Sequence, residues 1–325
     1  MPSQAHPLRP VNVHLGSWSP TPLVPVQLTA DGPVIWSKLE FLHPGGSTKD
    51  RIANYILTKA YRSGALKPGG WVVEASSGST SIAMAMVCAQ LGLRFVAVMP
   101  EGVSNERSLI IKAYGGEVRF APADAGMVGC LDLARKTAEQ LGGFLPRQFE
   151  NDDNASAHRF GTAVEVIKQV PTQHVDAIVS GVGTGGTLVG LYHGLRDHGC
   201  AARPYAARPI ATSGEGLAMG CFDHAECSSF SKRIPGVVDG MSRLYQPDDL
   251  DGLEEIEVGD DLAIQTTREL IKLGFPVGPS SGLNYAAAIV AYNKLRDQGN
   301  HMPCIVTVFC DRMERYFSTE LFAGL

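Results

Sequence analysis

The sequence predicts an α/β protein with two lobes, in which helices flank parallel-rich sheets. Short β-rich segments alternate with amphipathic helical segments along most of the chain. With 325 residues, 44% of them hydrophobic and 19% charged, the chain can bury a large core. This length favours two lobes over one compact domain.

The expected elements follow one another in a regular order. Strands are expected at 34–41, 71–75, 95–99, 117–120, 177–180 and 304–309. Helices are expected at 50–63, 79–91, 105–114, 131–141 and 262–273. Residues 212–251 are rich in Gly, Ser, Asp and Pro, and we expect either an irregular binding element or a solvated excursion there.

The charge and composition of the chain indicate which kind of molecule the protein binds. The net charge of -5, without a cluster of Lys and Arg, disfavours nucleic acid and anionic membranes and favours small molecules. The chain has no long uncharged apolar segment, and residues 1–10 have no apolar signal core, so we expect a cytoplasmic protein. The seven cysteines form no CxxC pair, so neither a disulfide framework nor a metal site is expected.

A hydroxyl-rich loop, Ser76-Ser77-Gly78-Ser79-Thr80-Ser81, connects the strand expected at 71–75 to a helix. Free backbone N–H groups and the positive end of the helix dipole are available to an anion at such a position. Ser and Thr are also good N-caps, but these hydroxyls are more numerous than capping needs. The loop therefore indicates a site for a carboxylate or a phosphate.

A glycine-rich run, Ser180-Gly181-Val182-Gly183-Thr184-Gly185-Gly186-Thr187, follows another expected strand. Backbone N–H groups at the N-terminus of a following helix would bind phosphate. The glycine spacing also matches the dinucleotide fingerprint, which normally has an acidic residue about 20 residues further on. Residues 198–213 contain no acid, but Arg203 and Arg208 leave an NADP-binding oxidoreductase open as the main alternative.

Lys49 ends the stretch His43-Pro44-Gly45-Gly46-Ser47-Thr48-Lys49 and opens an expected helix, where the helix dipole disfavours a cation. The same field lowers the pKa of the amine and favours its nucleophilic form. An amine that can hold an aldehyde as a Schiff base, together with a distant phosphate loop, suggests pyridoxal phosphate.

Asp311 follows the apolar strand expected at 304–309, at the edge of an α/β sheet where ligands bind. The alternative for Asp311 is a structural pair with Arg312 or Arg315.

Several motifs together resemble one family. They are Thr21-Pro22-Leu23-Val24, Lys38-Leu39-Glu40, Pro44-Gly45-Gly46-Ser47-Thr48-Lys49-Asp50-Arg51, Glu74 to Ser81, Met99-Pro100-Glu101, Gln148-Phe149-Glu150-Asn151, Ser180 to Thr187, Gly278-Pro279-Ser280-Ser281-Gly282 and Asp311-Arg312-Met313-Glu314-Arg315-Tyr316. In this order they resemble the cysteine synthase and cystathionine β-synthase family, which belongs to fold type II of the pyridoxal-phosphate enzymes. The resemblance implies a tryptophan synthase β-like fold and a homodimer. It also implies a small mobile lobe at 50–150 and a large lobe, formed by 1–49 and 151–325, that carries the phosphate loop.

The resemblance also implies roles for individual residues. Lys49 would be the Schiff-base lysine, and Gly183, Thr184, Gly185, Gly186 and Thr187 would hold the cofactor phosphate. Ser79 and Asp311 would contact the cofactor, Asp311 at the pyridine nitrogen. The substrate carboxylate would bind to Ser76, Ser77, Gly78, Thr80 and Gln148.

Three positions depart from the family pattern. Ser79 stands where the family has the asparagine of a TSGNTG motif, and its hydroxyl has one donor and a shorter reach. The 235–243 segment brings Asp239 and Arg243 to a loop that faces the substrate in the family, where Arg243 is either a site for a second carboxylate or an exposed loop residue. Met313 replaces a common glycine.

The implied reaction is a β-replacement on a serine-derived L-amino acid through an aminoacrylate intermediate, as in a cysteine synthase. Because of Ser79, a β-elimination that releases pyruvate and ammonia, as in an L-cysteine desulfhydrase, remains open as an alternative. A binding protein without activity is disfavoured because Lys49 and the phosphate loop are both intact.

Overall fold

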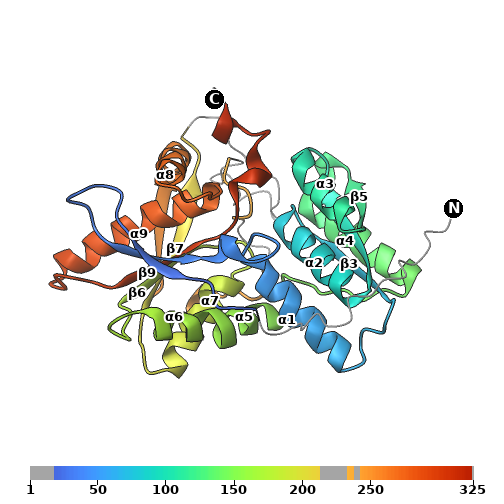
Figure 1. Cartoon of the computed structure of the whole chain (residues 1–325), viewed down its shortest axis with the longest axis horizontal. Coiled ribbons are helices and arrows are strands. Elements are labelled where there is room, and N and C mark those ends of the chain that lie inside the picture. Colours follow the sequence, from blue (N-terminus) through green and yellow to red (C-terminus); the bar gives the residue numbers. More distant parts are fainter. Residues whose placement is uncertain (1–17, 213–232, 238–241, 324–325) are drawn as a thin grey trace.

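The computed structural model describes residues 18–212, 233–237 and 242–323. Two separate sheets organise this part of the chain (Figure 1). The larger has the order β1-β2-β9-β6-β7-β8, and the smaller has the order β3-β4-β5. Their separation confirms the two-part α/β architecture expected from the sequence.

The larger sheet is parallel except at one edge, where β1 pairs antiparallel with β2. Its strands are β1 (Leu23–Val26), β2 (Ile35–Leu39), β6 (Ala177–Gly181), β7 (Arg203–Ile210), β8 (Glu254–Gly259) and β9 (Ile305–Phe309). Helices α8 (Asp260–Lys272) and α9 (Pro279–Asp297) cover one face of this sheet. Helices α5 (Asp153–Ala157), α6 (Ala163–Gln169) and α7 (Gly186–Asp197) cover the other (Figure 1). Apolar side chains fill both interfaces.

The smaller sheet is wholly parallel and consists of β3 (Trp71–Ala75), β4 (Arg94–Pro100) and β5 (Glu117–Ala121). Helices α1 (Lys49–Arg62), α2 (Ser79–Leu91), α3 (Asn105–Ala113) and α4 (Gly126–Leu141) surround it. Its strands and α2, α3 and α4 all lie between residues 71 and 141. That residues 50–150 move as one lobe stays a prediction.

Short helices complete the described chain. A π-helix, η3 (His158–Thr162), lies between α5 and α6. The 3-10 helices are η1 (Glu40–Leu42), η2 (Ala123–Ala125), η4 (Pro247–Asp249), η5 (Met313–Tyr316) and η6 (Glu320–Phe322). Within the described parts of 212–251, η4 is the only helix and there is no strand, as the composition of this stretch predicted.

The expected strands and helices agree with observed ones except at their ends. The largest difference is at α4, which begins five residues before the expected start at 131. The pattern missed β1, β7, β8, α5, α6 and α9, whereas the helix expected after the glycine-rich run is α7. Helix α9 is the clearest case, because its first ten residues, 279–288, are all buried and leave no polar face there to produce a helical period. Burial on most sides is not sufficient to hide a helix, because α2 was predicted although nine of its thirteen residues are buried.

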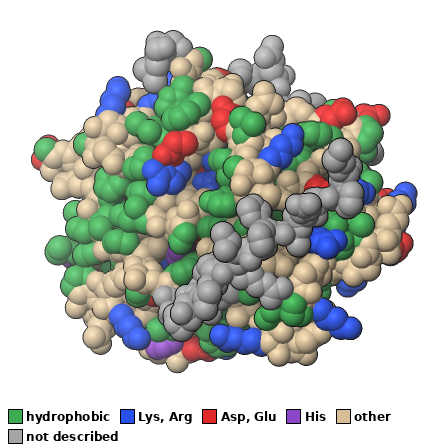
Figure 2. All heavy atoms as spheres, turned by 45° about the vertical axis from the view of Figure 1, so that its right-hand side comes forward, with side chains coloured by type: hydrophobic (Ala, Val, Ile, Leu, Met, Phe, Trp, Pro, Cys, Tyr) green, Lys and Arg blue, Asp and Glu red, His purple; other side chains and the backbone are tan. Residues whose placement is uncertain are grey.

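One face of the molecule shows how charge is distributed over the surface. The face in Figure 2 has acidic and basic side chains interspersed among polar and apolar ones. No helix in the described ranges is long and apolar enough to cross a membrane.

Candidate active site

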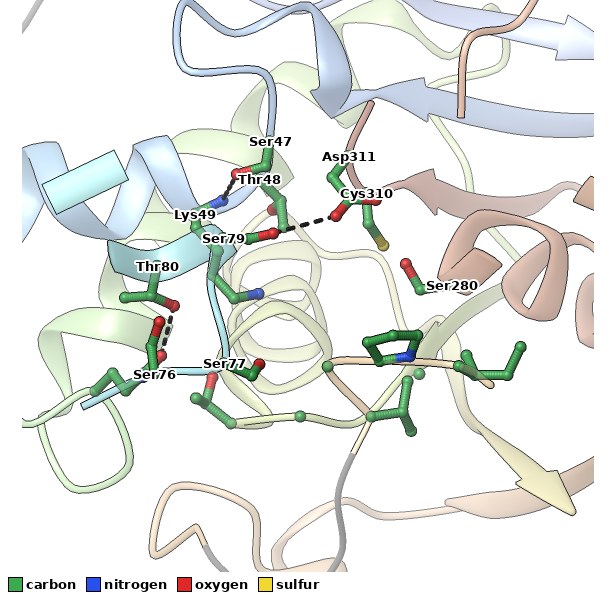
Figure 3. A pocket seen from close by; sticks show the side chains of 18 of the residues that line it. Ser47, Thr48, Lys49, Ser76, Ser77, Ser79, Thr80, Ser280, Cys310 and Asp311 are labelled. Carbon is green, nitrogen blue, oxygen red and sulfur yellow. Dashed lines mark hydrogen bonds between the residues drawn. The ribbon is translucent and has the colours of Figure 1, made fainter. Parts of the chain in front are cut away.

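A cavity of about 300 Å³, called the main cavity because Lys49 and both polar loops line it, lies where residues of both sheets and their helices meet. This volume is at the lower end of the range of small-molecule sites, roughly 300–1,000 Å³. Figure 3 shows the Lys49 side chain pointing into the space that Ser77, Ser79 and Ser280 surround. The cavity therefore brings together residues that are far apart in the sequence.

Lys49 is the first residue of α1, as the sequence predicted within one residue. Burial lowers the pKa of its amine, whereas nearby Cys310 and Asp311 oppose that shift. Within the described residues, the Lys49 amine has no hydrogen bond or ion pair at its Nζ atom. An amine that is partly buried, lowered in pKa and free to form a bond is suited to nucleophilic chemistry.

The loop before α2 faces the same cavity through Ser76, Ser77, Ser79 and Thr80. The Ser76 hydroxyl accepts hydrogen bonds from the backbone N–H groups of Gly78 (3.0 Å) and Ser81 (3.1 Å), so it caps the helix. Gly78 itself has a φ of 150°. Any larger residue at this position would collide with Arg107, because an added Cβ would lie 2.3 Å from Arg107 Cδ.

Gln148 joins this loop from a distant segment. Its Oε1 accepts a hydrogen bond from the Thr80 hydroxyl at 2.7 Å, and its Nε2 donates to the Ala75 carbonyl at 2.7 Å. The residues that the family resemblance assigns to the substrate carboxylate therefore lie together, except that Gly78 does not line the cavity.

The glycine-rich loop and the start of α7 form another wall, where Gly183, Thr184, Gly185 and Thr187 line the cavity and Gly186 does not. Gly185 has a φ of 79°, in the left-handed region that favours glycine. A Cβ on Gly183 would lie 2.2 Å from the Gly236 carbonyl oxygen, and one on Gly186 would lie 2.0 Å from Asn154 Oδ1. Glycine is therefore required here by close contacts as well as by conformation.

Asp311 lies in the cavity wall with 5% of its surface exposed. Its Oδ2 accepts hydrogen bonds from the Tyr316 hydroxyl at 2.7 Å and from the Ser79 hydroxyl at 3.1 Å (Figure 3). Its buried Oδ1 has no hydrogen-bond partner. The alternative structural pair with a neighbouring arginine is wrong, because Arg312 binds Glu314 and Arg315 binds the carbonyls of Gly45 and Gly46.

Sequence reasoning missed several residues in and around the cavity, among them Ser280, Asn154 and His158. Ser280 lines it at the first turn of α9, and the preceding Gly278-Pro279 pair is a signal of a helix start that marks this position. Asn154 donates hydrogen bonds to Thr184 Oγ1 (2.9 Å) and to the Gln148 carbonyl (2.7 Å). His158 contacts Thr187 Oγ1 through Nε2 at 3.3 Å. No local pattern marks these two contacts, because each joins separate segments.

Arg243 lies away from the main cavity. It is exposed and lines a second cavity together with Glu74, Arg147 and Glu150. Asp239 and the rest of residues 238–241 lie outside the described residues. The structure therefore gives Arg243 no contact with the main cavity, and its role as a substrate ligand stays a prediction.

The residues around the main cavity fit pyridoxal phosphate. The cofactor needs an amine for its aldehyde and N–H donors for its phosphate, and it needs a polar group for its ring. Lys49, the glycine-rich start of α7 and the unpaired Asp311 Oδ1 meet these needs around one space.

The comparison with known proteins agrees with a pyridoxal-phosphate site. Residues 15–311 match the family described as pyridoxal-phosphate dependent enzyme. The chain is 36% identical to the cysteine synthase of Staphylococcus aureus, over 93% of this chain and 94% of the relative.

Two solved structures are also similar. O-ureido-L-serine synthase has a TM-score of 0.80 at 34% identity, covering 94% of this chain and 93% of the other. A hydrogen sulfide-producing enzyme (Fn1055) of Fusobacterium nucleatum has a TM-score of 0.78 at 32% identity, covering 90% and 85%. The chain therefore belongs to the family of pyridoxal-phosphate dependent enzymes that includes the cysteine synthases.

Proposed function

We propose that the protein replaces the β-substituent of a serine-derived L-amino acid with an incoming nucleophile. The observation that carries the proposal is the convergence of Lys49, the hydroxyl-rich loop and the glycine-rich loop on one cavity. The similarity to cysteine synthases supports the same reaction. Pyridoxal phosphate, when bound, supplies an electron sink for negative charge at Cα of the substrate.

Lys49 is assigned two tasks. Its Nζ atom would hold the cofactor aldehyde, and the same amine would remove the α-proton of the substrate. Burial supports both tasks because it lowers the pKa of the amine and so favours its neutral form.

Two loops are proposed to bind the anionic groups. Backbone N–H groups of Gly183–Thr187 hold the phosphate at the N-terminus of α7, so the glycine spacing needs no dinucleotide to explain it. Ser76, Ser77, Gly78, Thr80 and Gln148 hold the substrate carboxylate. Thr80 and Gln148 already bond to each other, which fixes the Gln148 amide at the cavity wall.

Asp311 and Ser280 are both candidates for contact with the cofactor ring. The resemblance assigns the pyridine nitrogen to Asp311, and Ser280 offers a hydroxyl from the start of α9 in the same cavity. Because Asp311 already accepts two hydrogen bonds, from Tyr316 and Ser79, we propose that it also fixes the Ser79 side chain.

β-Elimination is the alternative reaction, and one observation favours it. The short Ser79 hydroxyl is turned towards Asp311, so it is less available to hold a substrate that has lost its β-substituent. The similar hydrogen sulfide-producing enzyme shows that the fold is compatible with a sulfide-releasing reaction.

One experiment tests both reactions. Purified holoenzyme is incubated with O-acetylserine, O-phosphoserine, serine or cysteine, with and without sulfide, and the products are identified by mass spectrometry. A β-substituted amino acid that requires sulfide supports replacement. Pyruvate that forms equally without sulfide supports elimination, and absence of both products would contradict the proposed function.

We also propose a cytoplasmic homodimer whose small lobe, residues 50–150, closes over the substrate. The family resemblance implies the dimer and the closure, and light scattering of the purified protein tests the dimer. The cytoplasmic location rests on the seven cysteines of the sequence, whose odd number and lack of a CxxC pair argue against a disulfide framework.

A further inference from the structure

Glu74 is a buried acid directly behind the proposed carboxylate pocket. It lies in β3 with 2% of its surface exposed. Its Oε1 accepts a hydrogen bond from the Ala75 N–H at 2.9 Å, and its Oε2 accepts one from the Gln148 N–H at 3.2 Å. The catalytic roles proposed above do not use this side chain.

These contacts connect Glu74 to the residues that line the cavity. Gln148 is bonded to Glu74 through its backbone and to Thr80 through its side chain. Ala75 directly precedes Ser76, and its carbonyl accepts from Gln148 Nε2. Glu74 therefore orients the Gln148 backbone at the point where the carboxylate of a substrate is proposed to bind.

No countercharge lies against Glu74 in the described structure. Glu74 also lines the second cavity, of about 710 Å³, together with five charged residues. They are Asp132 and Arg135 of α4, Arg147 and Glu150 of the loop after α4, and Arg243. Arg135 is paired with Asp132, and the other three are exposed to solvent. In the neighbouring strand β4 the residue in register with Glu74 is Ala97, and α2 begins with the uncharged residues Ser79, Thr80 and Ser81.

The pKa of the Glu74 carboxyl is therefore set by burial and by backbone hydrogen bonds. Burial raises the pKa of its carboxyl to about 7, and the backbone N–H groups of Ala75, Gln148 and Arg147 oppose that shift. A second carboxylate brought close in a site of low dielectric raises such a pKa further, because two like charges disfavour each other. Binding of an anion next to Glu74 should then be coupled to proton binding.

We propose that Glu74 is a positioning residue that takes up a proton when the substrate carboxylate binds to the 76–80 loop and Gln148. The inference rests on the proposed function, because it requires an amino acid in this pocket. Neutral Glu74 removes the repulsion between two carboxylates while it keeps a hydrogen-bonding group against the Gln148 N–H. Substrate binding is thus tightest at a pH below the pKa of Glu74 in the free enzyme, and it weakens as the pH rises from that pKa towards the higher pKa in the complex.

Proton uptake can be measured directly. Holoenzyme is titrated with L-alanine, which has a carboxylate but no β-leaving group, in a calorimeter near pH 7.5. Repeating the titration in phosphate and in Tris, which differ in ionisation enthalpy, gives the number of protons exchanged. The wild type should take up more protons than Glu74→Gln, because glutamine keeps the shape of the side chain but cannot titrate. The control Glu150→Gln, an exposed residue at the same second cavity, should match the wild type.

Kinetics provide a second readout. Between about pH 6 and 8, KM of the wild type for the donor amino acid should rise severalfold, because Glu74 loses its proton near the middle of this range. In Glu74→Gln the rise in KM should largely disappear, whereas kcat should follow the same pH profile as in the wild type. A merely structural role would change KM at all pH values alike.

Equal proton uptake in the wild type and Glu74→Gln would overturn the inference. If Glu74→Gln fails to fold, infrared difference spectra of the wild type decide, because L-alanine should increase the band of protonated carboxyl groups. No such increase would overturn the inference too. Failure of the wild type to bind any amino acid would contradict the proposed function itself.

Discussion

At the residue scale, Ser79 and Asp311 are joined by a hydrogen bond in which the Ser79 hydroxyl donates to Asp311 Oδ2 at 3.1 Å. We expect Ser79→Asn to lower pyruvate formation relative to β-replacement product, because the amide of asparagine has more donors and a longer reach. One donor hydrogen bond to a carboxylate contributes about 1–3 kcal/mol, so the product ratio should change severalfold or more. The measurement is the ratio of the two products from one donor substrate at full cofactor occupancy.

Ser19→Asn is the control for this substitution, since Ser19 is exposed and does not line the main cavity. It should leave the ratio unchanged. An unchanged ratio in Ser79→Asn would show that Ser79 does not decide between the two reactions.

His158 is a second residue with a testable role. It lies in a π-helix with 1% exposure, and its Nδ1 contacts Thr162 Oγ1 at 2.9 Å while its Nε2 contacts Thr187 Oγ1 at 3.3 Å. Burial lowers the pKa of its imidazole to about 3, so the ring is neutral near pH 7. A neutral ring that donates from Nε2 leaves the Thr187 hydroxyl proton free for the cofactor phosphate.

We expect His158→Phe to weaken the binding of pyridoxal phosphate to the apoenzyme about fivefold or more, because a hydrogen bond of this kind contributes about 1 kcal/mol or more. The dissociation constant is measured by absorbance as the cofactor is added back. His174→Phe is the control, since 61% of the His174 side chain is exposed. Equal affinity in the wild type and His158→Phe would contradict this role.

At the scale of elements, α3 is held to the C-terminal segment by polar contacts. Both Glu106 carboxylate oxygens accept from Ser318, one from its N–H and one from its hydroxyl, each at 2.9 Å. The Ser104 hydroxyl donates to the Arg315 carbonyl at 3.0 Å. The Arg107 guanidinium lies over the Tyr316 ring at 5.3 Å, and its Nη1 donates to the Ser77 carbonyl at 2.9 Å. These contacts connect the small sheet region, through the hydroxyl-rich loop, to the segment after β9.

Glu106→Ala should release α3 from the C-terminal segment. Loss of two hydrogen bonds of about 1 kcal/mol each should speed hydrogen exchange in α3 severalfold or more while leaving the six-stranded sheet unchanged. Exchange followed by mass spectrometry measures this difference. Glu314→Ala is the control, because Glu314 bonds to Arg312 two residues away and not to α3. Identical exchange of α3 in Glu106→Ala and the wild type would show that these contacts do not hold the helix.

At the scale of the whole molecule, a buried ion cluster connects β2, α1 and α6. Arg51 of α1 pairs with Glu40 at 2.6 Å and with Glu165 of α6 at 2.7 Å, and Lys38 of β2 pairs with Glu165 at 2.7 Å. Burial alone would raise the pKa of Glu40, but the Arg51 guanidinium outweighs burial and holds that pKa well below the usual range. The carboxylate therefore stabilises the fold at neutral pH, and this stability is lost as the pH falls through the lowered pKa.

Arg51→Met should destabilise the protein by about 3–5 kcal/mol, because it leaves buried carboxylates without their partner. Its acid unfolding should also begin at higher pH than that of the wild type, since the pKa of Glu40 rises when Arg51 is removed. Urea unfolding at several pH values measures both effects. Arg135→Met, which breaks an exposed pair with Asp132, is the control and should change stability by less than about 1 kcal/mol. If both variants unfold alike, the buried cluster is not a major source of stability.

The sequence alone determined the family, the lysine and the two loops that face the cavity. These features are local, because a strand, a turn with required glycines and a helix start lie within a few consecutive residues. Lys49, Ser76 to Thr80 and Gly183 to Thr187 could therefore be identified before their distances were known. Elements with one exposed face, such as α1, were also predicted, because their periodicity reports burial on one side.

Tertiary structure decided which polar groups meet. The Ser79 to Asp311 bond joins residues 232 positions apart, and the Glu74 to Gln148 bond joins residues 74 positions apart. Such contacts depend on how parallel strands and their crossovers bring separate loops to one place, and no local pattern encodes that placement. The structure also separated Arg243 from the main cavity and revealed α9, whose first ten residues are all buried and leave no polar face from which a helix is predicted.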